Sequence, residues 1–146
     1  MDSLDSKIID ILRHDGRIPN ARIARIVGVS EGTVRRRLRQ LVEGNYISIV
    51  ALINLEKMGL VAEGLIGVQV DPDKIDEVAN ELAELEQISW VSVTTGSYDI
   101  FCWAALPSSE ELGKFLRSEV GTIKGVRSTE TFVNLATKKR GFGVSL

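Results

Sequence analysis

The sequence contains very few of the residues that build metal sites, disulfides or nucleophilic centres. Among its 146 residues there is one cysteine, Cys102, and one histidine, His14. A single cysteine cannot form an internal disulfide, and one Cys with one His supplies too few ligands for a zinc site. We therefore interpret Cys102 as a small core residue and His14 as a residue that contacts the end of its helix. We predict neither a metal nor a cofactor.

Long apolar runs are absent as well. No run approaches the roughly 20 residues that a membrane-spanning helix needs. The acidic start at residues 1–5 lacks the basic and apolar regions of a signal peptide. With 44% hydrophobic and 26% charged residues, the composition is ordinary for a globular chain long enough to form two small domains. We expect a cytoplasmic protein that does not enter a membrane.

Charge is distributed unevenly, although the formal net charge is only -2. Residues 1–50 hold nine Lys and Arg against six Asp and Glu, whereas residues 51–146 hold nine against fourteen. The first part therefore carries a net charge of +3 and the second a net charge of -5. A basic part suits a polyanion such as DNA and an acidic part does not, so we expect DNA to bind at the N-terminal end.

Arginine is concentrated in residues 29–41, which have the pattern of a short amphipathic helix. Ser30 is a suitable N-cap, able to accept a hydrogen bond from the backbone N–H of Thr33, and apolar residues follow at helical spacing. Four arginines lie within residues 35–39 with no acidic residue among them. Such a helix suits a DNA major groove, because outward side chains reach base edges while flanking arginines reach the phosphates.

The division of this helix into faces predicts the roles of individual side chains. Thr33, Arg36 and Gln40 point away from the apolar face, so we place them near base edges. Arg35 and Arg37 fall on the flanks, where phosphates line the groove. A solvated basic helix face is the alternative for any run of charges. The residues that we predict to bind DNA are Asn20, Arg22, Ser30, Thr33, Arg35, Arg36, Arg37, Arg39 and Gln40.

Two further helices precede the arginine-rich one. Residues 4–14 carry apolar side chains at helical spacing, and a second helix begins near Pro19. Gly28 ends the second helix, and only two residues separate it from the third. Two helices joined by so tight a turn indicate a helix-turn-helix. We therefore predict a winged-type helix-turn-helix DNA-binding domain over residues 1–46.

The stretch that follows, from Tyr46 to Leu55, is rich in β-branched and apolar residues. It lacks the Pro-rich or Ser-rich composition of a flexible linker. We predict an ordered, strand-like connector over residues 47–59, which packs and can pair with a partner chain.

Beyond residue 60 the pattern changes to two rounds of strand, helix and strand. In each round an amphipathic helix separates two apolar strands. Two such rounds fold most simply as a ferredoxin-like βαββαβ sandwich of the α+β class, with four antiparallel strands and both helices on one face. We assign this second domain to residues 60–146, with strands at 64–70, 90–95, 100–106 and 126–135.

That fold leaves one face of the sheet open, yet the strands carry apolar residues on both faces. Leu65 alternates with Ile66 along one strand, and Trp103 alternates with Cys102 along another. An apolar face of this extent must be covered by a partner, and a second copy of the chain is the simplest partner. We therefore predict a homodimer with two-fold symmetry.

Three groups of residues stand at a specific spacing. They are Leu4-Asp5…Ile8…Ile11-Leu12…Asp15-Gly16-Arg17, then Ala24…Val27-Gly28-Val29-Ser30…Thr33-Val34…Arg36-Arg37-Leu38…Leu41…Gly44…Ile47, and Thr95-Gly96-Ser97-Tyr98-Asp99. Together with the order of the elements, they resemble the Lrp/AsnC (feast/famine) family of prokaryotic transcription regulators over nearly the whole chain. The resemblance implies a dimer, often assembled into octamers. It also implies that the second domain binds a small effector, commonly an amino acid, at an interface between dimers.

On this chain the resemblance places the effector at the loop 96–99. Gly96 permits a positive φ, Tyr98 offers a ring and a hydroxyl group, and Asp99 can accept a hydrogen bond from an ammonium group. Thr129 and Thr131 are weaker candidates for the same cleft. The alternative is an ordinary β-turn in which Asp99 caps its own backbone and Tyr98 packs. The predicted effector-binding residues are Gly96, Ser97, Tyr98, Asp99, Thr129 and Thr131.

The leading interpretation is a sequence-specific DNA-binding transcription regulator that is not an enzyme. Its expected partners are double-stranded DNA, a small-molecule effector and further copies of the chain. One alternative is an architectural DNA-coating protein with little sequence preference. Another is a haem-biosynthetic decarboxylase-like enzyme on the same two-domain frame, although one His and one unpaired Cys leave little to carry such chemistry.

Overall fold

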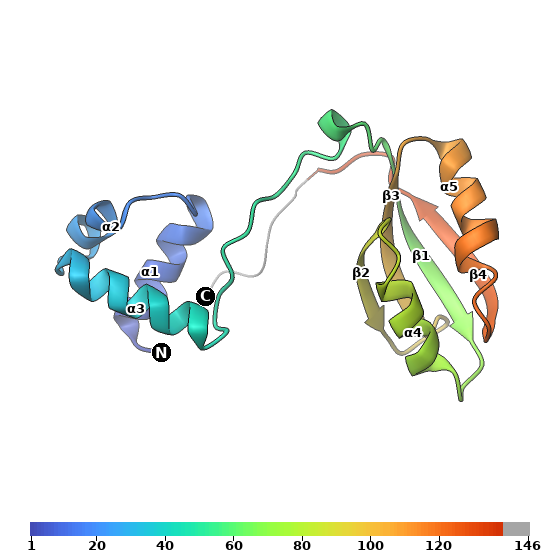
Figure 1. The fold of residues 1–146 in the computed structure, drawn as a ribbon, viewed down its shortest axis with the longest axis horizontal. Coiled ribbons are helices and arrows are strands. Elements are labelled where there is room, and N and C mark those ends of the chain that lie inside the picture. The colour runs from blue at the N-terminus through green and yellow to red at the C-terminus, as the bar shows by residue number, and fades with distance from the viewer. Residues whose placement is uncertain (139–146) are drawn as a thin grey trace. The chain divides into compact units, whose positions relative to one another are not determined.

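The computed structural model describes residues 1–138 and divides them into two compact units, Met1–Leu52 and Ile53–Lys138 (Figure 1). Each unit has a hydrophobic core of its own, so we describe them separately. None of the helices in this range has the length and apolar character needed to cross a membrane.

The first unit is a helix-turn-helix of three helices. Asp2 begins the first helix with a capping box, in which its side chain accepts from the backbone N–H groups of Leu4 and Asp5. Gly28, at φ 77°, ends the second helix in the left-handed conformation that glycine adopts freely, and Ser30 then caps the third. The helices are α1 (Ser3–His14), α2 (Asn20–Val27) and α3 (Glu31–Glu43).

The apolar stripes of all three helices meet in the core of this unit, as their helical periodicity predicts. Asp5 is the one charged residue that is buried within the described part of the chain. A buried carboxylate needs partners, and those of Asp5 join α1 to α3, as the next subsection describes. The buried core residues are Ile8, Ile9, Ile23, Ala24, Val34 and Leu41.

The segment after α3 is irregular, so the strand that we predicted for the connector is not formed in the single chain. Residues 44–61, all of which are described, hold neither a strand nor a β-hairpin wing. Their one regular element is η1 (Glu56–Met58), a turn of 3₁₀ helix. A strand needs a neighbour that takes its backbone hydrogen bonds, and no neighbouring strand lies beside this segment. Apolar side chains of the segment, including Ile49 and Val50, are therefore exposed.

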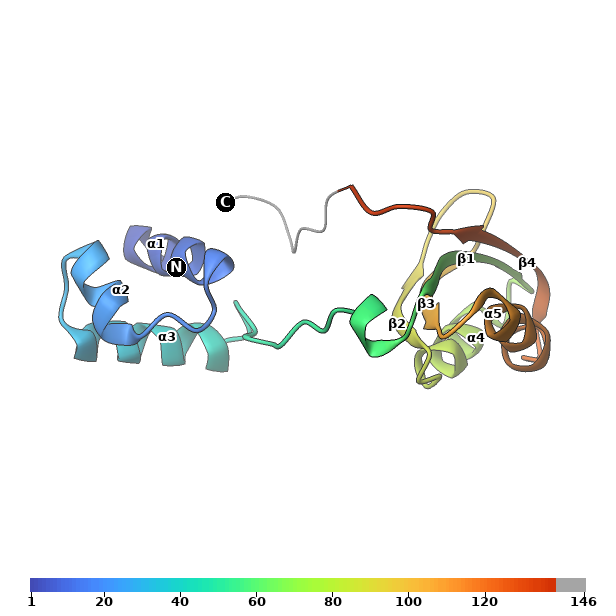
Figure 2. The ribbon, with the colours of Figure 1, turned by 90° about the horizontal axis from the view of Figure 1, so that it is seen from above.

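The second unit is an antiparallel α+β sandwich. Its elements are β1 (Ala62–Val70), α4 (Ile75–Ala83), β2 (Ile88–Val93), β3 (Ile100–Leu106), α5 (Ser109–Phe115), the π-helical turn η2 (Leu116–Val120) and β4 (Val126–Val133). The strands pair in the order β2-β3-β1-β4, every pair antiparallel, and both helices cover one face of the sheet (Figure 2). The predicted ferredoxin-like topology is confirmed.

Helices pack on one face of this sheet and not on the other. On the helix side, Ile66, Ile100 and Cys102 are fully buried. The opposite face, which we call the open face, is covered by no described element; Trp90 there is 50% exposed and Phe132 is 47% exposed. The alternation that the sequence predicted for both faces is therefore present. The large apolar side chains of the open face are Leu65, Trp90, Phe101, Trp103 and Phe132.

Candidate functional site

The arginine-rich helix α3 begins at a well-formed cap. Ser30 Oγ accepts from the backbone N–H of Thr33 at 3.1 Å, and the hydroxyl oxygens of the two residues lie 2.9 Å apart. This is the N-cap that the sequence predicts, and it fixes the first turn of the helix. Gly32 is exposed in that turn, so the backbone there can be approached closely.

Three polar side chains of α3 are available to a ligand. Arg36, Arg39 and Gln40 are exposed, and none of them makes a hydrogen bond or ion pair with a residue in the described range. Arg36 and Arg39 lie three residues apart and therefore share a helix surface. Because no carboxylate pairs with them, both guanidinium groups can bind an anion without breaking an existing contact.

Arg35 is held by a neighbour on its own helix. Its Nη2 donates to Glu31 Oε1 at 2.7 Å, and the two side chains are 61% and 47% exposed. An exposed pair one helical turn apart contributes only about 0.3–0.5 kcal/mol. A phosphate oxygen can therefore replace the Glu31 carboxylate at little cost in free energy.

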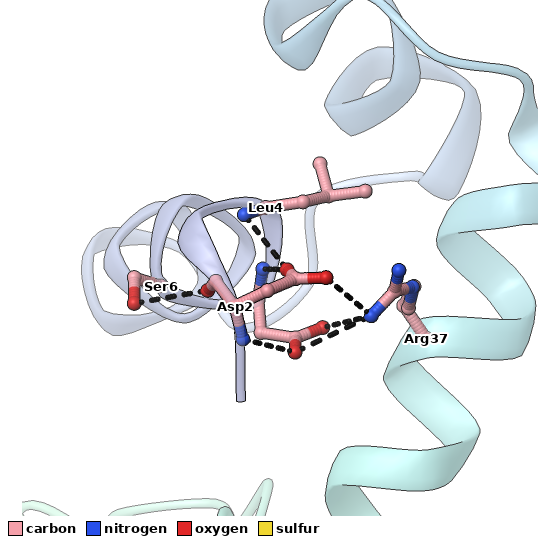
Figure 3. A network of polar contacts seen from close by, with 5 residues as sticks. Asp2, Leu4, Ser6 and Arg37 are labelled. Carbon is pink, nitrogen blue, oxygen red and sulfur yellow. Dashed lines mark hydrogen bonds and ion pairs between the residues drawn. The ribbon is translucent and has the colours of Figure 1, made fainter.

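Arg37 does not stand free on its flank of the helix. Its Nη1 lies 2.8 Å from Asp2 Oδ2 and 3.4 Å from both carboxylate oxygens of Asp5 (Figure 3). The Arg37 side chain is only 27% exposed, less than half the value for Arg35. The Arg37 guanidinium is thus engaged by the first turn of α1, a partner that its flank position in the sequence did not indicate.

The remaining predicted DNA-binding residues lie on α2. Arg22 is exposed and has no ion-pair partner within residues 1–138. Asn20 is half-buried and lines a shallow groove of about 330 Å³ beside Arg35, Leu38 and Arg39 of α3. The structure thus places Asn20 next to the basic side of α3.

The loop 96–99 joins β2 to β3 and is fixed to the end of β1. Asp99 Oδ2 accepts from the backbone N–H of Val70 at 2.8 Å, and the Asp99 N–H donates to the carbonyl of Val68 at 3.0 Å. β3 begins only at Ile100, so no backbone carbonyl of β3 is available to the N–H of Val70. The Asp99 carboxylate takes the place of that carbonyl as the acceptor. Asp99 Oδ1 makes no hydrogen bond with the described residues.

Tyr98 packs on the open face of the sheet. A Cβ atom added to Gly67 would lie 2.8 Å from Tyr98 Cγ, so the ring rests directly on the glycine backbone. Its centroid lies 5.4 Å from that of Phe101 and 6.4 Å from that of Phe132, both in edge-to-face geometry. Gly96, at φ 112°, and Ser97 are exposed. The loop therefore has a packed half and an exposed half.

Thr129 and Thr131 do not join this loop in one cleft. Thr129 pairs with Val68 and Thr131 with Ile66, and residues directly opposite each other in a ladder share a face of the sheet. That face is the one beneath the helices, whereas Tyr98 lies on the open face. The sequence indicates which residues alternate, but the pairing register decides which face each one occupies.

Gln69 anchors the exposed half of the loop and was not among the predicted site residues. Its Nε2 donates to the carbonyl of Ser97 at 2.9 Å, and its Oε1 accepts from Ser128 Oγ of β4. A polar side chain between Val68 and Val70 of an apolar strand was the signal that could have identified it.

Cys102 is unsuited to nucleophilic chemistry. Its side chain is fully buried, and desolvation raises the pKa of its thiol to about 12. The thiolate is the reactive form of cysteine, so this residue acts as an apolar core side chain. Within residues 1–138 no cluster of His, Cys, Asp and Glu could hold a metal ion.

A capped basic helix within a helix-turn-helix, followed by a separate α+β unit, defines a two-domain DNA-binding regulator. Two family models match the chain: the AsnC-type helix-turn-helix domain over residues 1–42 and the Lrp/AsnC ligand binding domain over residues 63–144. The chain belongs to the Lrp/AsnC family of transcription regulators, in which a helix-turn-helix domain binds DNA and a second domain binds a small ligand.

Curated relatives are transcription regulators of matching length. An uncharacterized HTH-type transcriptional regulator of Pyrococcus furiosus is 41% identical, with 97% of each chain covered. The HTH-type transcriptional regulator FL11 of Pyrococcus horikoshii is 39% identical, with 95% of this chain and 92% of that protein covered.

Solved structures of low sequence identity share the fold. AsnC of E. coli is 24% identical with a TM-score of 0.90, and the alignment covers 97% of each chain. A transcriptional regulator of Neisseria meningitidis, solved in complex with L-Met, is 23% identical with a TM-score of 0.91, covering 100% of this chain and 96% of the other.

Proposed function

We propose that this regulator reads DNA sequence with the exposed side of α3, where Arg36, Arg39 and Gln40 meet base edges while Arg35 binds a phosphate. The observation that carries the proposal is the pair of exposed, unpaired guanidinium groups of Arg36 and Arg39 behind a capped helix start. Arginine donates two parallel hydrogen bonds to guanine, which makes it the commonest specific reader in the major groove. Ser30 lies at the helix N-terminus, where phosphate contacts are typical, and Thr33 in the first turn stays assigned to base edges.

Alanine substitutions distinguish the two roles. Arg36→Ala should cost about 1–3 kcal/mol of binding free energy and relax the preference for a duplex selected from a random pool. Arg35→Ala should weaken binding to all duplexes alike and lower the slope of log K against log salt concentration by about 0.9. The matched control is Arg127→Ala, which removes an arginine of similar exposure from the second unit.

The same measurements test the architectural alternative. A coating protein binds selected and unselected duplexes alike, and its affinity follows charge alone. An Arg36→Ala protein with unchanged sequence preference would contradict specific reading by this side chain. We propose no enzymatic activity, since the relatives are named as transcriptional regulators. We place the site of action in the cytoplasm, where a regulator meets its DNA.

We propose that a second copy of the chain covers the open face and forms a two-fold symmetric homodimer, which assembles further into octamers. The support is the group of large apolar side chains on a sheet face that no described element covers, with Trp90 and Phe132 about half exposed. Two recognition helices of one dimer would then face half-sites about 34 Å apart on a near-palindromic operator. The exposed apolar connector, residues 47–59, can gain strand pairing in the same assembly.

Sedimentation of the full chain tests the assembly. The double substitution Trp90→Ser with Phe132→Ser should shift the protein toward monomer, because it removes exposed apolar surface from both outer strands of the open face. Ile26→Ser is the matched control, since Ile26 is an exposed apolar residue of the first unit. A double variant that sediments as the wild type does at every concentration would contradict the proposed dimer face.

We propose that the exposed half of the loop 96–99 forms part of a small-molecule site at a subunit interface, with an amino acid as the ligand class. Gly96 and Ser97 are exposed, and Asp99 Oδ1 is left to accept from an α-ammonium group after Oδ2 has bound Val70. Such a ligand changes DNA affinity only if it binds one assembly better than another. A typical coupling is about 1–3 kcal/mol.

Calorimetry against the twenty amino acids is the direct test of this site. The informative variant is Asp99→Asn, because asparagine retains an oxygen that can accept from Val70 while losing the charge that an ammonium group prefers. We expect Asp99→Asn to abolish the heat of binding while DNA binding without ligand is unchanged. Absence of heat for all twenty in the wild type would identify the loop as an ordinary turn.

A further inference from the structure

We propose that Arg37 is a positioning residue for DNA recognition: it holds α3 against the first turn of α1 through Asp2 and Asp5 and leaves phosphate binding to other arginines. This inference rests on the DNA-binding role proposed for α3 and adds to it the contact that sets where α3 points. Figure 3 shows the arrangement, with Arg37 reaching from α3 to two carboxylates at the start of α1.

The geometry places one guanidinium nitrogen between two acids. Arg37 Nη1 lies 2.8 Å from Asp2 Oδ2 and 3.4 Å from each carboxylate oxygen of Asp5. The Asp5 side chain is 8% exposed, so its charge is largely removed from water. A buried carboxylate is tolerated when a cation and hydrogen-bond donors satisfy it, and Arg37 is the cation that does so here.

The two carboxylates are fixed by contacts that do not involve Arg37. Asp2 Oδ1 accepts from the backbone N–H groups of Leu4 and Asp5, and Asp5 Oδ2 accepts from the backbone N–H of Asp2. This capping box holds both acids at the N-terminus of α1 whether or not an arginine is present. Arg37 therefore docks into a preformed acceptor, and the two carboxylates give up little further freedom when it binds.

Release of Arg37 to a DNA phosphate would be unfavourable for the same reason. It would leave the largely buried Asp5 carboxylate without its cation and close to the negative charge of the DNA backbone. Arg35 faces no such penalty, because its partner Glu31 is exposed and is itself about half in water. Helix geometry alone places Arg35 and Arg37 on equivalent flanks of α3, but their partners in the structure give them different roles.

The contact bears on recognition because of where Arg37 lies in α3. Arg37 directly follows Arg36. The ion pair between α3 and α1 is therefore adjacent to a side chain that we assign to base edges. The apolar core between the helices is largely non-directional, whereas a charged hydrogen bond is directional and restricts rotation and sliding of one helix on the other. Loss of this ion pair should therefore reduce the preference for one DNA sequence over another more than it reduces the non-specific affinity for DNA.

The test compares three full-length variants on a duplex selected from a random pool and on the unselected pool. Asp5→Asn keeps the side-chain size and the capping oxygen but removes the charge that holds Arg37. We expect about tenfold weaker binding to the selected duplex and a much smaller change on the pool. We expect Arg37→Gln to reduce the affinity for the selected duplex in the same way. The double variant should bind that duplex as tightly as the weaker-binding of the two single variants, because both substitutions break the same contact.

The matched control is Asp10→Asn, which removes an exposed acid from α1 that makes no ion pair with a described residue. It should leave both affinities unchanged or slightly increased, as expected when a negative charge is removed near DNA. Measurements are made at a temperature where circular dichroism shows every variant folded, so a fall in stability alone does not alter the ratio of the two affinities.

The opposite results would overturn the proposal. If Arg37 bound a phosphate, Asp5→Asn would free it and tighten binding, and Arg37→Gln would lower the salt slope by about 0.9 for all duplexes. Additive losses in the double variant would likewise show that the two residues act separately. The test is distinct from that of the proposed function, because a wild-type protein that prefers no duplex would contradict sequence reading itself.

Discussion

Replacing Asp99 by alanine should destabilise the second unit, because the carboxylate completes the hydrogen bonding of β1. The substitution removes the acceptor that lies 2.8 Å from the backbone N–H of Val70. Val70 is only 2% exposed, so water cannot readily replace the lost acceptor. Hydrogen bonds to charged groups contribute about 1.5–3 kcal/mol, and an unsatisfied buried donor costs about 1–3 kcal/mol. We expect the free energy of unfolding to fall by about 2 kcal/mol.

Urea unfolding followed by tryptophan fluorescence measures this change selectively. Both tryptophans, Trp90 and Trp103, belong to the second unit, so their emission reports on that unit and not on the helix-turn-helix. The midpoint should move to lower urea concentration while the slope m is unchanged, since the surface exposed on unfolding is the same. Protein concentration must be equal for all variants, because assembly contributes to apparent stability.

Asp99→Asn is the matched variant for this experiment as well. Its amide oxygen can still accept from Val70, so the loss should stay below about 1 kcal/mol. An alanine variant within about 0.5 kcal/mol of the wild type would refute the reasoning, since surface substitutions without a structural role fall in that range. An asparagine variant as unstable as the alanine variant would show that charge, and not the hydrogen bond to Val70, is what matters.

Three further outcomes follow from contacts elsewhere in the chain. The backbone hydrogen bond from Asp5, and then the charge of Arg37, hold the pKa of Asp2 below its ordinary value of 3.8. The ionised Asp2 therefore stabilises the first unit above about pH 4, and this contribution is lost as the pH falls further. The melting temperatures of the wild type and of Asp2→Asn should differ above that pH and become equal below it. Ser30→Ala should lower the stability of the first unit by about 1 kcal/mol and Ser30→Gly by only a few tenths, as thermal unfolding monitored by circular dichroism would show. Cys102, with a thiol pKa of about 12, should resist a thiol reagent in the folded protein at neutral pH and react fully in urea.

The helices and strands could be predicted because their signals are local. Ser30 and Gly28 mark helix ends by their own side-chain chemistry, and the alternation of Leu65 with Ile66 marks a strand with two apolar faces. Arg37 could not be assigned in this way, because the Asp5 carboxylate that meets it lies 32 residues earlier in the chain. Its flank position is a property of one helix, but its partner depends on how two helices pack.

The second unit shows the same limit at its sheet. Thr129 and Thr131 alternate correctly along β4, yet the register against β1 decides that they share a face with Val68 and Ile66. The connector forms no strand in the single chain for a related reason, since β-branched composition favours a strand but does not supply the neighbour that a strand requires. What the sequence could not indicate in each case was a pairing between distant segments.

The packing of the Tyr98 ring on the backbone of Gly67 predicts which mutations a genetic screen should recover. The ring rests where any side chain at Gly67 would collide with it, at 2.8 Å from the first added carbon atom. If the loop 96–99 binds an effector as proposed, a screen for mutants that no longer respond to it should recover substitutions of Gly67, almost thirty positions before the loop, together with those of the loop itself. Because Tyr98 also contacts Phe132 at the open face, mixed dimers of the proposed kind would contain the displaced ring, and a wild-type copy should complement such alleles poorly.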